Sequence, residues 1–130
     1  MADIKFPADV KYAESDEWIR VDGDTATIGI SDYAQDALND LVYVEFKGVG
    51  ETLAAGESFG EIESVKAASE VYMPIAGEII AVNDELTSEP EMVNEDPFGN
   101  GWMVKIRITD ASNLANLMDA EAYKQLCESR

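Results

Sequence analysis

Lys66 is the side chain of this sequence that is best placed for chemistry. It is the only basic residue between Lys47 and Lys105, and it lies in the segment Glu61-Ile-Glu-Ser-Val-Lys-Ala-Ala-Ser-Glu70, between two stretches that read as strands. At the tip of a hairpin, a lysine has a fixed backbone and a free side chain, which suits a covalent tether. A solvated lysine without a chemical role has the same local pattern, so both interpretations stand at this point.

Other reactive groups are few in this chain of 130 residues. It contains no histidine, which excludes Ser-His and Cys-His nucleophile pairs and HExxH zinc sites. The acidic segments that begin at Asn83 and Asn94 lack the glycine and the distal glutamate of an EF-hand, so we expect solvated turns and no metal site. A single cysteine, Cys127, excludes an intrachain disulfide and agrees with a reducing compartment.

The charge balance limits the partners. Nine Lys and Arg residues against 27 Asp and Glu residues give a formal net charge of −18. This charge repels nucleic acids and anionic lipid, and it raises encounter rates with basic protein surfaces. The N-terminus does not read as a signal peptide, and no apolar run is long enough to span a bilayer. We expect one soluble, unexported domain over residues 1–130.

Short strands separated by turns must position Lys66. Asp22-Gly-Asp24 predicts a tight hairpin, because glycine readily adopts the positive φ of such a turn. Ser31 or Asp32 is expected to cap a short helix that ends near Asn39-Asp40. The predicted strands are 18–21, 26–30, 42–46, 59–64, 70–73, 78–82 and 102–108.

Two further regions complete the predicted mainly β chain. Residues 83–101 are rich in Asn, Glu, Pro and Gly, and we expect a long functional loop there. Near the C-terminus, Leu114, Leu117 and Met118 share one helical face, and a second helix is expected with Asp119 as its cap.

The lysine segment has a family resemblance. Glu63-Ser-Val-Lys66-Ala67, followed by Ser69-Glu70 and Pro74-Ile-Ala-Gly-Glu-Ile79, resembles the lipoylation segment of the glycine cleavage system H proteins. The likeness extends in the same order from about Lys11 to about Leu126. Its other motifs are Glu17-Trp18, Gly29-Ile-Ser-Asp-Tyr-Ala-Gln35, Val42-Tyr-Val-Glu-Phe46, Asn94-Glu-Asp-Pro-Phe98 and Gly101-Trp102. The family commonly has histidine before the Glu-Trp pair, where this chain has Asp16.

The resemblance implies a carrier and not an enzyme. It implies a flattened, mainly β lipoyl domain of the barrel-sandwich hybrid type with peripheral helices, and lipoic acid joined to Lys66 by an amide. The implied partners are a pyridoxal-phosphate glycine decarboxylase, a tetrahydrofolate-dependent aminomethyltransferase, dihydrolipoyl dehydrogenase and the lipoate-attaching enzymes. The carrier would shuttle an aminomethyl group from the first to the second and its dithiol to the third.

A carried aminomethyl group makes a chemical demand on the carrier. A neutral nitrogen can expel the thiolate and then lose formaldehyde to water, so the carrier should favour the ammonium form and exclude solvent. Glu17 is our candidate for holding that ammonium, because the resemblance places this glutamate near the docked arm. Ser15 and Glu70 are secondary candidates for arm docking.

Several alternatives remain open at this point. Lipoyl domains of 2-oxoacid dehydrogenases usually have aspartate before the lysine, and biotin carriers flank it with methionines, whereas Val65 and Ala67 flank Lys66 here. A lipoate relay carrier without a glycine cleavage role, and an acidic interaction module that is never modified, are the other two. We expect a monomer in a bacterial cytoplasm, or in a mitochondrial matrix after loss of a transit peptide.

Overall fold

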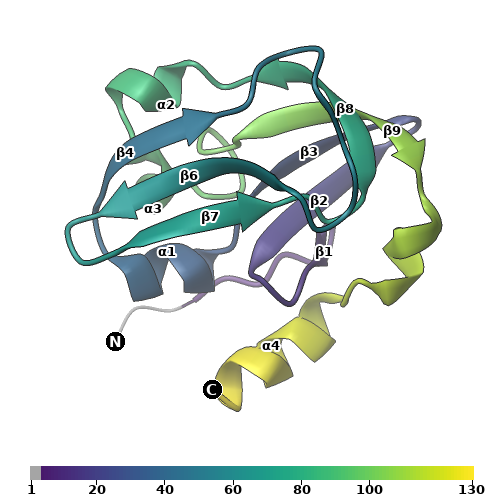
Figure 1. Cartoon of the computed structure of the whole chain (residues 1–130). Coiled ribbons are helices and arrows are strands. Elements are labelled where there is room, and N and C mark those ends of the chain that lie inside the picture. The colour runs from purple at the N-terminus through teal and green to yellow at the C-terminus, as the bar shows by residue number, and fades with distance from the viewer. Residues whose placement is uncertain (1–3) are drawn as a thin grey trace.

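Two antiparallel β-sheets face each other across the main hydrophobic core (Figure 1). The computed structural model describes residues 4–130. The larger sheet has the order β1 (Lys11–Tyr12), β2 (Glu17–Asp22), β3 (Thr25–Ile30), β9 (Val104–Asp110), β8 (Ala76–Val82) and β5 (Thr52–Leu53). The smaller sheet has the order β4 (Leu41–Phe46), β6 (Ser58–Ser64) and β7 (Ala68–Tyr72). The expected mainly β sandwich with C-terminal helices is confirmed.

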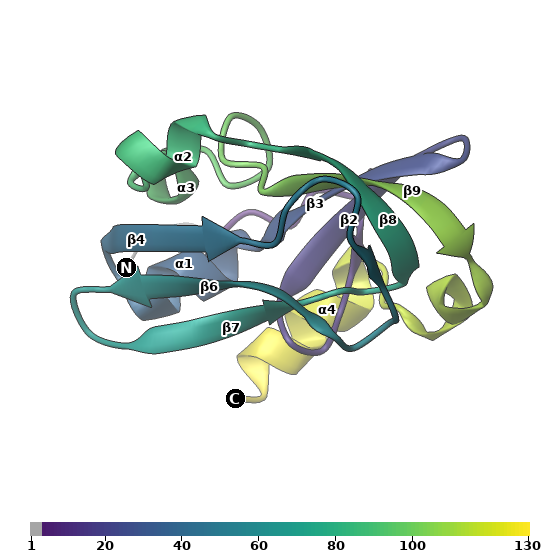
Figure 2. The ribbon, with the colours of Figure 1, turned by 45° about the horizontal axis from the view of Figure 1, so that its top comes forward.

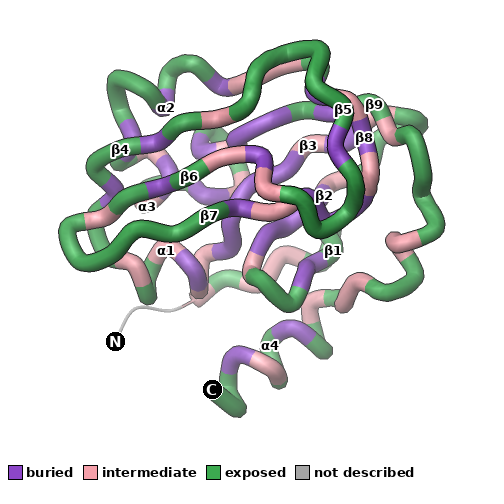
Figure 3. Tube along the Cα trace, viewed as in Figure 1, coloured by how far each residue is buried: buried purple, intermediate pink, exposed green. Residues whose placement is uncertain are grey.

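The core is built by alternation along both sheets. Ile28 and Ile106 of the larger sheet and Phe59 and Ile62 of the smaller sheet are buried, while the residues between them face outward. Figure 3 shows this alternation of buried and exposed positions along β4 and β6. Burial of these apolar side chains is the main favourable contribution to folding.

The first predicted hairpin is confirmed. Strands β2 and β3 pair from Glu17–Ile30 to Asp22–Thr25, and Gly23 has a φ of +66° in the turn between them. The helix that follows is α1 (Asp32–Leu38), and its cap is Ser31, whose Oγ accepts a hydrogen bond from the backbone N–H of Ala34.

Strand β4 departs from the simple alternation that its sequence predicts. The register with β6 shifts between Leu41 and Tyr43, so Leu41 and Val44 point inward and Val42 is 55% exposed. This shift has the pairing pattern of a β-bulge, in which one extra residue changes the face that following side chains occupy. A pattern of period two cannot reveal such an insertion.

Residues 83–101 are not the structureless loop that the composition indicates. They contain two four-residue helices, α2 (Glu85–Ser88) and α3 (Met92–Glu95). Leu86 and Val93 are fully buried and anchor these turns in the main core. Neither helix has a capping side chain, so the usual start signal is absent and tertiary burial decides the conformation.

The C-terminal segment forms the two expected helical elements. The first is the 3₁₀ helix η1 (Ser112–Asn116), and the second is α4 (Ala120–Glu128), capped by the Asp119 carboxylate. Tyr123 of α4 stacks on Tyr12 with ring centroids 4.4 Å apart, in a second apolar cluster outside the sandwich. Helix α4 therefore packs beside the start of the larger sheet (Figure 2).

Candidate functional site

Lys66 lies in the turn that joins β6 and β7, at the projecting end of the smaller sheet (Figure 2). The Oγ of Ser64 accepts hydrogen bonds from the backbone N–H groups of Lys66, at 3.1 Å, and Ala67, at 3.0 Å. The N–H of Val65 donates to the Asp40 carbonyl oxygen at 3.0 Å. These bonds fix the backbone of the turn while the Lys66 residue remains exposed.

The Lys66 side chain extends toward the C-terminal end of α1. Its Nζ donates a hydrogen bond to the carbonyl oxygen of Ala37 at 2.9 Å. Carbonyl groups in the last turn of a helix have no partner within the helix and carry partial negative charge, so they attract an ammonium. Ala37 therefore marks where the tip of the hairpin meets the helix.

A cleft of about 160 Å³ begins at this end of α1. It lies between the helix, the smaller sheet and the turn that precedes β2. Its lining residues are Ser15, Asp16, Glu17, Ile30, Ala34, Ala37, Leu38, Ile62, Ser69, Glu70 and Val71. Ala37 thus contacts the Lys66 amine and also lines the cleft.

Glu17 is the buried acid of the cleft. The residue is 1% exposed, and its two carboxyl oxygens have separate partners. Oε1 accepts a hydrogen bond from the Ser15 hydroxyl, and Oε2 accepts one from the backbone N–H of Tyr72 at 3.0 Å. Burial raises the pKa of Glu17 to about 7, although these two hydrogen bonds oppose the shift. Glu17 can therefore take up or release a proton near neutral pH.

The candidate docking residues of the sequence analysis come together in this cleft. Ser15 contacts Glu17 directly, and exposed Glu70 reaches the same cleft from β7. The sequence did not indicate the roles of the Tyr72 N–H and the Ala37 carbonyl. Both are main-chain groups, which leave no residue-type signal, and long-range folding brings them to the site.

Two other classes of site were considered in the structure. Within residues 4–130, no group of three or more His, Cys, Asp or Glu side chains is arranged to hold a metal ion. Over the same residues, no helix is long and apolar enough to cross a membrane.

Comparison with known proteins decides the family. Residues 10–130 match the family model described as glycine cleavage H-protein. The chain belongs to the glycine cleavage H-protein family. The H-protein family carries covalently bound lipoate, and its members are non-catalytic carriers of the glycine cleavage system. This chain is therefore a lipoyl carrier of that system and not an enzyme, as the resemblance implied.

Individual H proteins show how far the similarity extends. The glycine cleavage system H protein of Bacteroides thetaiotaomicron is 53% identical over 121 residues, which cover 93% of this chain and 96% of that protein. The mitochondrial H protein 2 of Arabidopsis thaliana is 48% identical, and the match covers 92% of this chain and 77% of that protein. The crystal structure of an H protein from Mycobacterium marinum superposes with a TM-score of 0.84 at 37% identity, covering 92% and 96% of the two chains.

Proposed function

We propose that Lys66 carries the lipoyl group through an amide bond and that the cleft ending at Glu17 receives the far end of this arm. The observation that supports the proposal most directly is the position of Ala37, which contacts the Lys66 amine and lines the cleft. The exposed side chain on a tied backbone fits covalent attachment, since an enzyme can reach the amine without unfolding the hairpin.

The bound lipoyl group supplies a dithiol that accepts and returns a carried group. The proposed partners are the pyridoxal-phosphate glycine decarboxylase, the aminomethyltransferase, dihydrolipoyl dehydrogenase and the lipoate-attaching enzymes. The carrier acts as one monomeric domain over residues 1–130 and has no nucleic acid or membrane partner. We place it in a bacterial cytoplasm, or in a mitochondrial matrix if the source is eukaryotic.

Glu17 is proposed to hold the amine of the aminomethyl cargo. A carboxyl with a pKa of about 7 is partly protonated at neutral pH, and an ammonium that enters the cleft draws it to the carboxylate form. The resulting ion pair keeps the amine protonated, so its lone pair is unavailable to expel the thiolate. Ser15 and Glu70 line the approach, where a hydroxyl and a second carboxylate add polar contacts.

The attachment proposal is tested by mass analysis of the tryptic peptide that contains Lys66. Protein from a lipoate-sufficient host should carry one lipoyl group on Lys66, and trypsin should no longer cleave after this residue. A chain without added mass would support the unmodified interaction module instead. Mixing lipoylated protein with the decarboxylase and glycine then separates a glycine cleavage carrier, which becomes loaded, from a lipoate relay, which does not.

The role of Glu17 is tested in the loaded protein. After removal of the decarboxylase, the Glu17→Gln variant should release formaldehyde and ammonia at least about threefold faster than wild type at neutral pH. Lipoylation should be equal in the two proteins, because Glu17 is buried away from the hairpin tip. Equal decay rates would assign protection of the cargo to water exclusion or to Glu70.

A further inference from the structure

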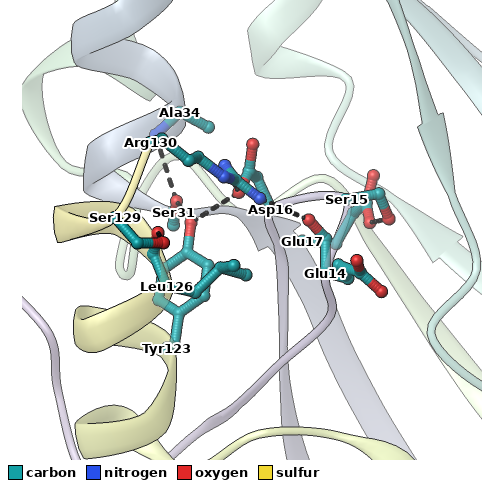
Figure 4. A network of polar contacts seen from close by, with 10 residues as sticks. All are labelled: Glu14, Ser15, Asp16, Glu17, Ser31, Ala34, Tyr123, Leu126, Ser129 and Arg130. Carbon is teal, nitrogen blue, oxygen red and sulfur yellow. Dashed lines mark hydrogen bonds and ion pairs between the residues drawn. The ribbon is translucent and has the colours of Figure 1, made fainter.

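The turn between β1 and β2 is tied to helix α4 through the side chain of Asp16 (Figure 4). Tyr123 Oη donates a hydrogen bond to Asp16 Oδ1 at 2.9 Å. Arg130, which follows α4, forms an ion pair with the same oxygen, with Nη1 at 2.7 Å, and its Nη2 donates to the Glu14 carbonyl oxygen at 2.8 Å. One guanidinium thus holds both the Asp16 side chain and the backbone of the turn.

The hydrogen bonds that lead to Asp16 run in one direction. Because the Tyr123 hydroxyl donates to Asp16, the Ser31 hydroxyl is the donor in its 2.6 Å bond with Tyr123 Oη. Ser31 Oγ in turn accepts from the N–H of Ala34 at 3.1 Å, and the Ser31 N–H donates to the Asp16 carbonyl oxygen at 2.9 Å. The cap of α1, the side chain of α4 and the turn therefore meet at one residue.

The backbone of Asp16 shows why the turn needs these contacts. Its φ is +81°, in the left-handed region that residues with a Cβ seldom adopt, although aspartate tolerates it better than most. Such a conformation persists where surrounding contacts maintain it. Asp16 stands between Ser15 and Glu17, so its conformation sets the direction of the chain between two residues that line the cleft.

We propose that Asp16, held by Arg130 and Tyr123, is a positioning residue for the cargo cleft. It maintains the turn in which the Ser15 hydroxyl reaches the Glu17 carboxyl. This inference rests on the proposed function of the cleft, and it adds a contribution from α4 and the residue after it, elements that supply no residue to the cleft lining. Asp16 acts through Glu17, since Asp16 Oδ1 is already occupied by its two donors.

The hydrogen bond from the Tyr72 N–H to Glu17 reports on this positioning without any arm or cargo. Arg130→Met keeps an apolar stem and removes the guanidinium. Arg107→Met is the matched control, because it makes the same charge change and removes an ion pair, with Glu78, at the opposite end of β2 and β3 from Glu17. Amide hydrogen exchange by NMR is measured on the unmodified protein of each variant.

In Arg130→Met, the exchange of the Tyr72 amide should rise at least about threefold relative to Arg107→Met, together with that of Ser31. Amides of the central strands β8 and β9 should be unchanged. Unchanged exchange at Tyr72 would overturn the proposal. An equal rise across all strands would also overturn it, since that pattern means a general loss of stability.

Two substitutions of Asp16 separate its carboxylate from its backbone conformation. Asp16→Asn keeps an acceptor oxygen and tolerates positive φ, so it should retain most of the Tyr72 protection. Asp16→Gly allows the same φ without an acceptor, so it should match Arg130→Met. Wild-type protection in Asp16→Gly would assign the position of the turn to the backbone alone and would overturn the role of the carboxylate.

The loaded protein links positioning to function. Arg130→Met should release formaldehyde faster than Arg107→Met, and adding Glu17→Gln to Arg130→Met should increase the rate less than Glu17→Gln does alone. If the Tyr72 amide responds as expected while Glu17→Gln has no effect on cargo release, the positioning role stands and the proposed function of Glu17 fails. Fully additive rates would overturn the claim that Arg130 acts through Glu17.

Discussion

At the residue scale, the site is defined by a carboxyl group placed where water cannot solvate it. Glu17 is 1% exposed and has two hydrogen-bond donors, yet burial has the larger effect and raises its pKa to about 7. A buried carboxylate without a cation is unfavourable, and a bound ammonium removes that penalty. The same feature that prepares the cleft for a cationic ligand therefore reduces the stability of the empty protein.

This cost gives the empty protein a specific pH dependence. The folded pKa of Glu17 lies above its ordinary value of 4.5, so between pH 4.5 and 7 the unfolded chain releases a proton that the folded chain retains. Stability from this group is complete below pH 4.5 and is lost as the pH rises through 7, by about 3 kcal/mol in total.

The Glu17→Gln variant should lack this loss, because its side chain does not titrate. Urea unfolding of both proteins at pH 5 and pH 8 measures it, and the remaining carboxylates titrate alike in both chains and cancel. The stability difference between variant and wild type should shift in favour of the variant at pH 8 by about 3 kcal/mol. A difference that stays constant between the two pH values would show that Glu17 does not have a raised pKa.

The attachment residue gives the second prediction at this scale. Lys66→Arg keeps the charge at an exposed turn, so the unfolding free energy should change by less than about 0.5 kcal/mol. The variant should accept no lipoyl group, because a guanidinium is not acylated under these conditions. Intact mass spectrometry checks both proteins from one lipoate-supplied host, and lipoyl mass on the variant would refute the assignment to Lys66.

At the scale of elements, the β6–β7 hairpin must be stiff enough to present Lys66. Its pairing shifts register between Ser58 and Gly60, next to the place where β4 crosses closely. A Cβ at Gly60 would meet the Glu45 carbonyl oxygen and the Phe46 ring, so this position requires glycine for space. Close approach of the β4 backbone thus supports the strand that leads to the lysine.

Gly60→Ala should therefore destabilise the protein by about 1–3 kcal/mol, because the β4 backbone must move to admit the methyl group. Gly48→Ala is the matched control, since a Cβ there meets nothing within 4 Å. It should change the unfolding free energy by no more than about 0.5 kcal/mol. Urea denaturation of the two variants compares them, and equal stabilities would contradict the close approach of β4 and β6.

At the scale of the whole molecule, the net charge of −18 is the dominant feature. The outer face of the smaller sheet contributes to it, because Glu45 pairs with Glu61 and Glu61 pairs with Glu70 across the three strands. Like charges opposite each other disfavour the sheet, so the stability of the fold does not explain this arrangement. A basic partner surface would be attracted to it.

If this charge steers docking, association with the decarboxylase and the aminomethyltransferase should slow as salt rises. From about 50 mM to about 500 mM salt, the Debye length falls to a few ångströms, and the association rate should drop at least about tenfold while dissociation changes little. Stopped-flow measurements over that range provide the test. Flat association rates would leave solubility as the role of the charge.

The sequence alone determined the strands around Lys66, the caps Ser31 and Asp119, the hairpin at Gly23 and the lysine itself. These features depend on local periodicity and on residues with strong backbone preferences, which neighbours in the chain reveal. Resemblance to a family then indicated Glu17, Ser15 and Glu70.

Only the tertiary structure decided the rest. The bulge in β4, the helices α2 and α3 and the clasp at Asp16 depend on contacts between distant segments, such as the 114-residue separation of Asp16 and Arg130. The pKa of Glu17 depends on burial in the same way. Burial and long-range pairing are properties of the folded chain, so no local pattern encodes them where propensity is weak.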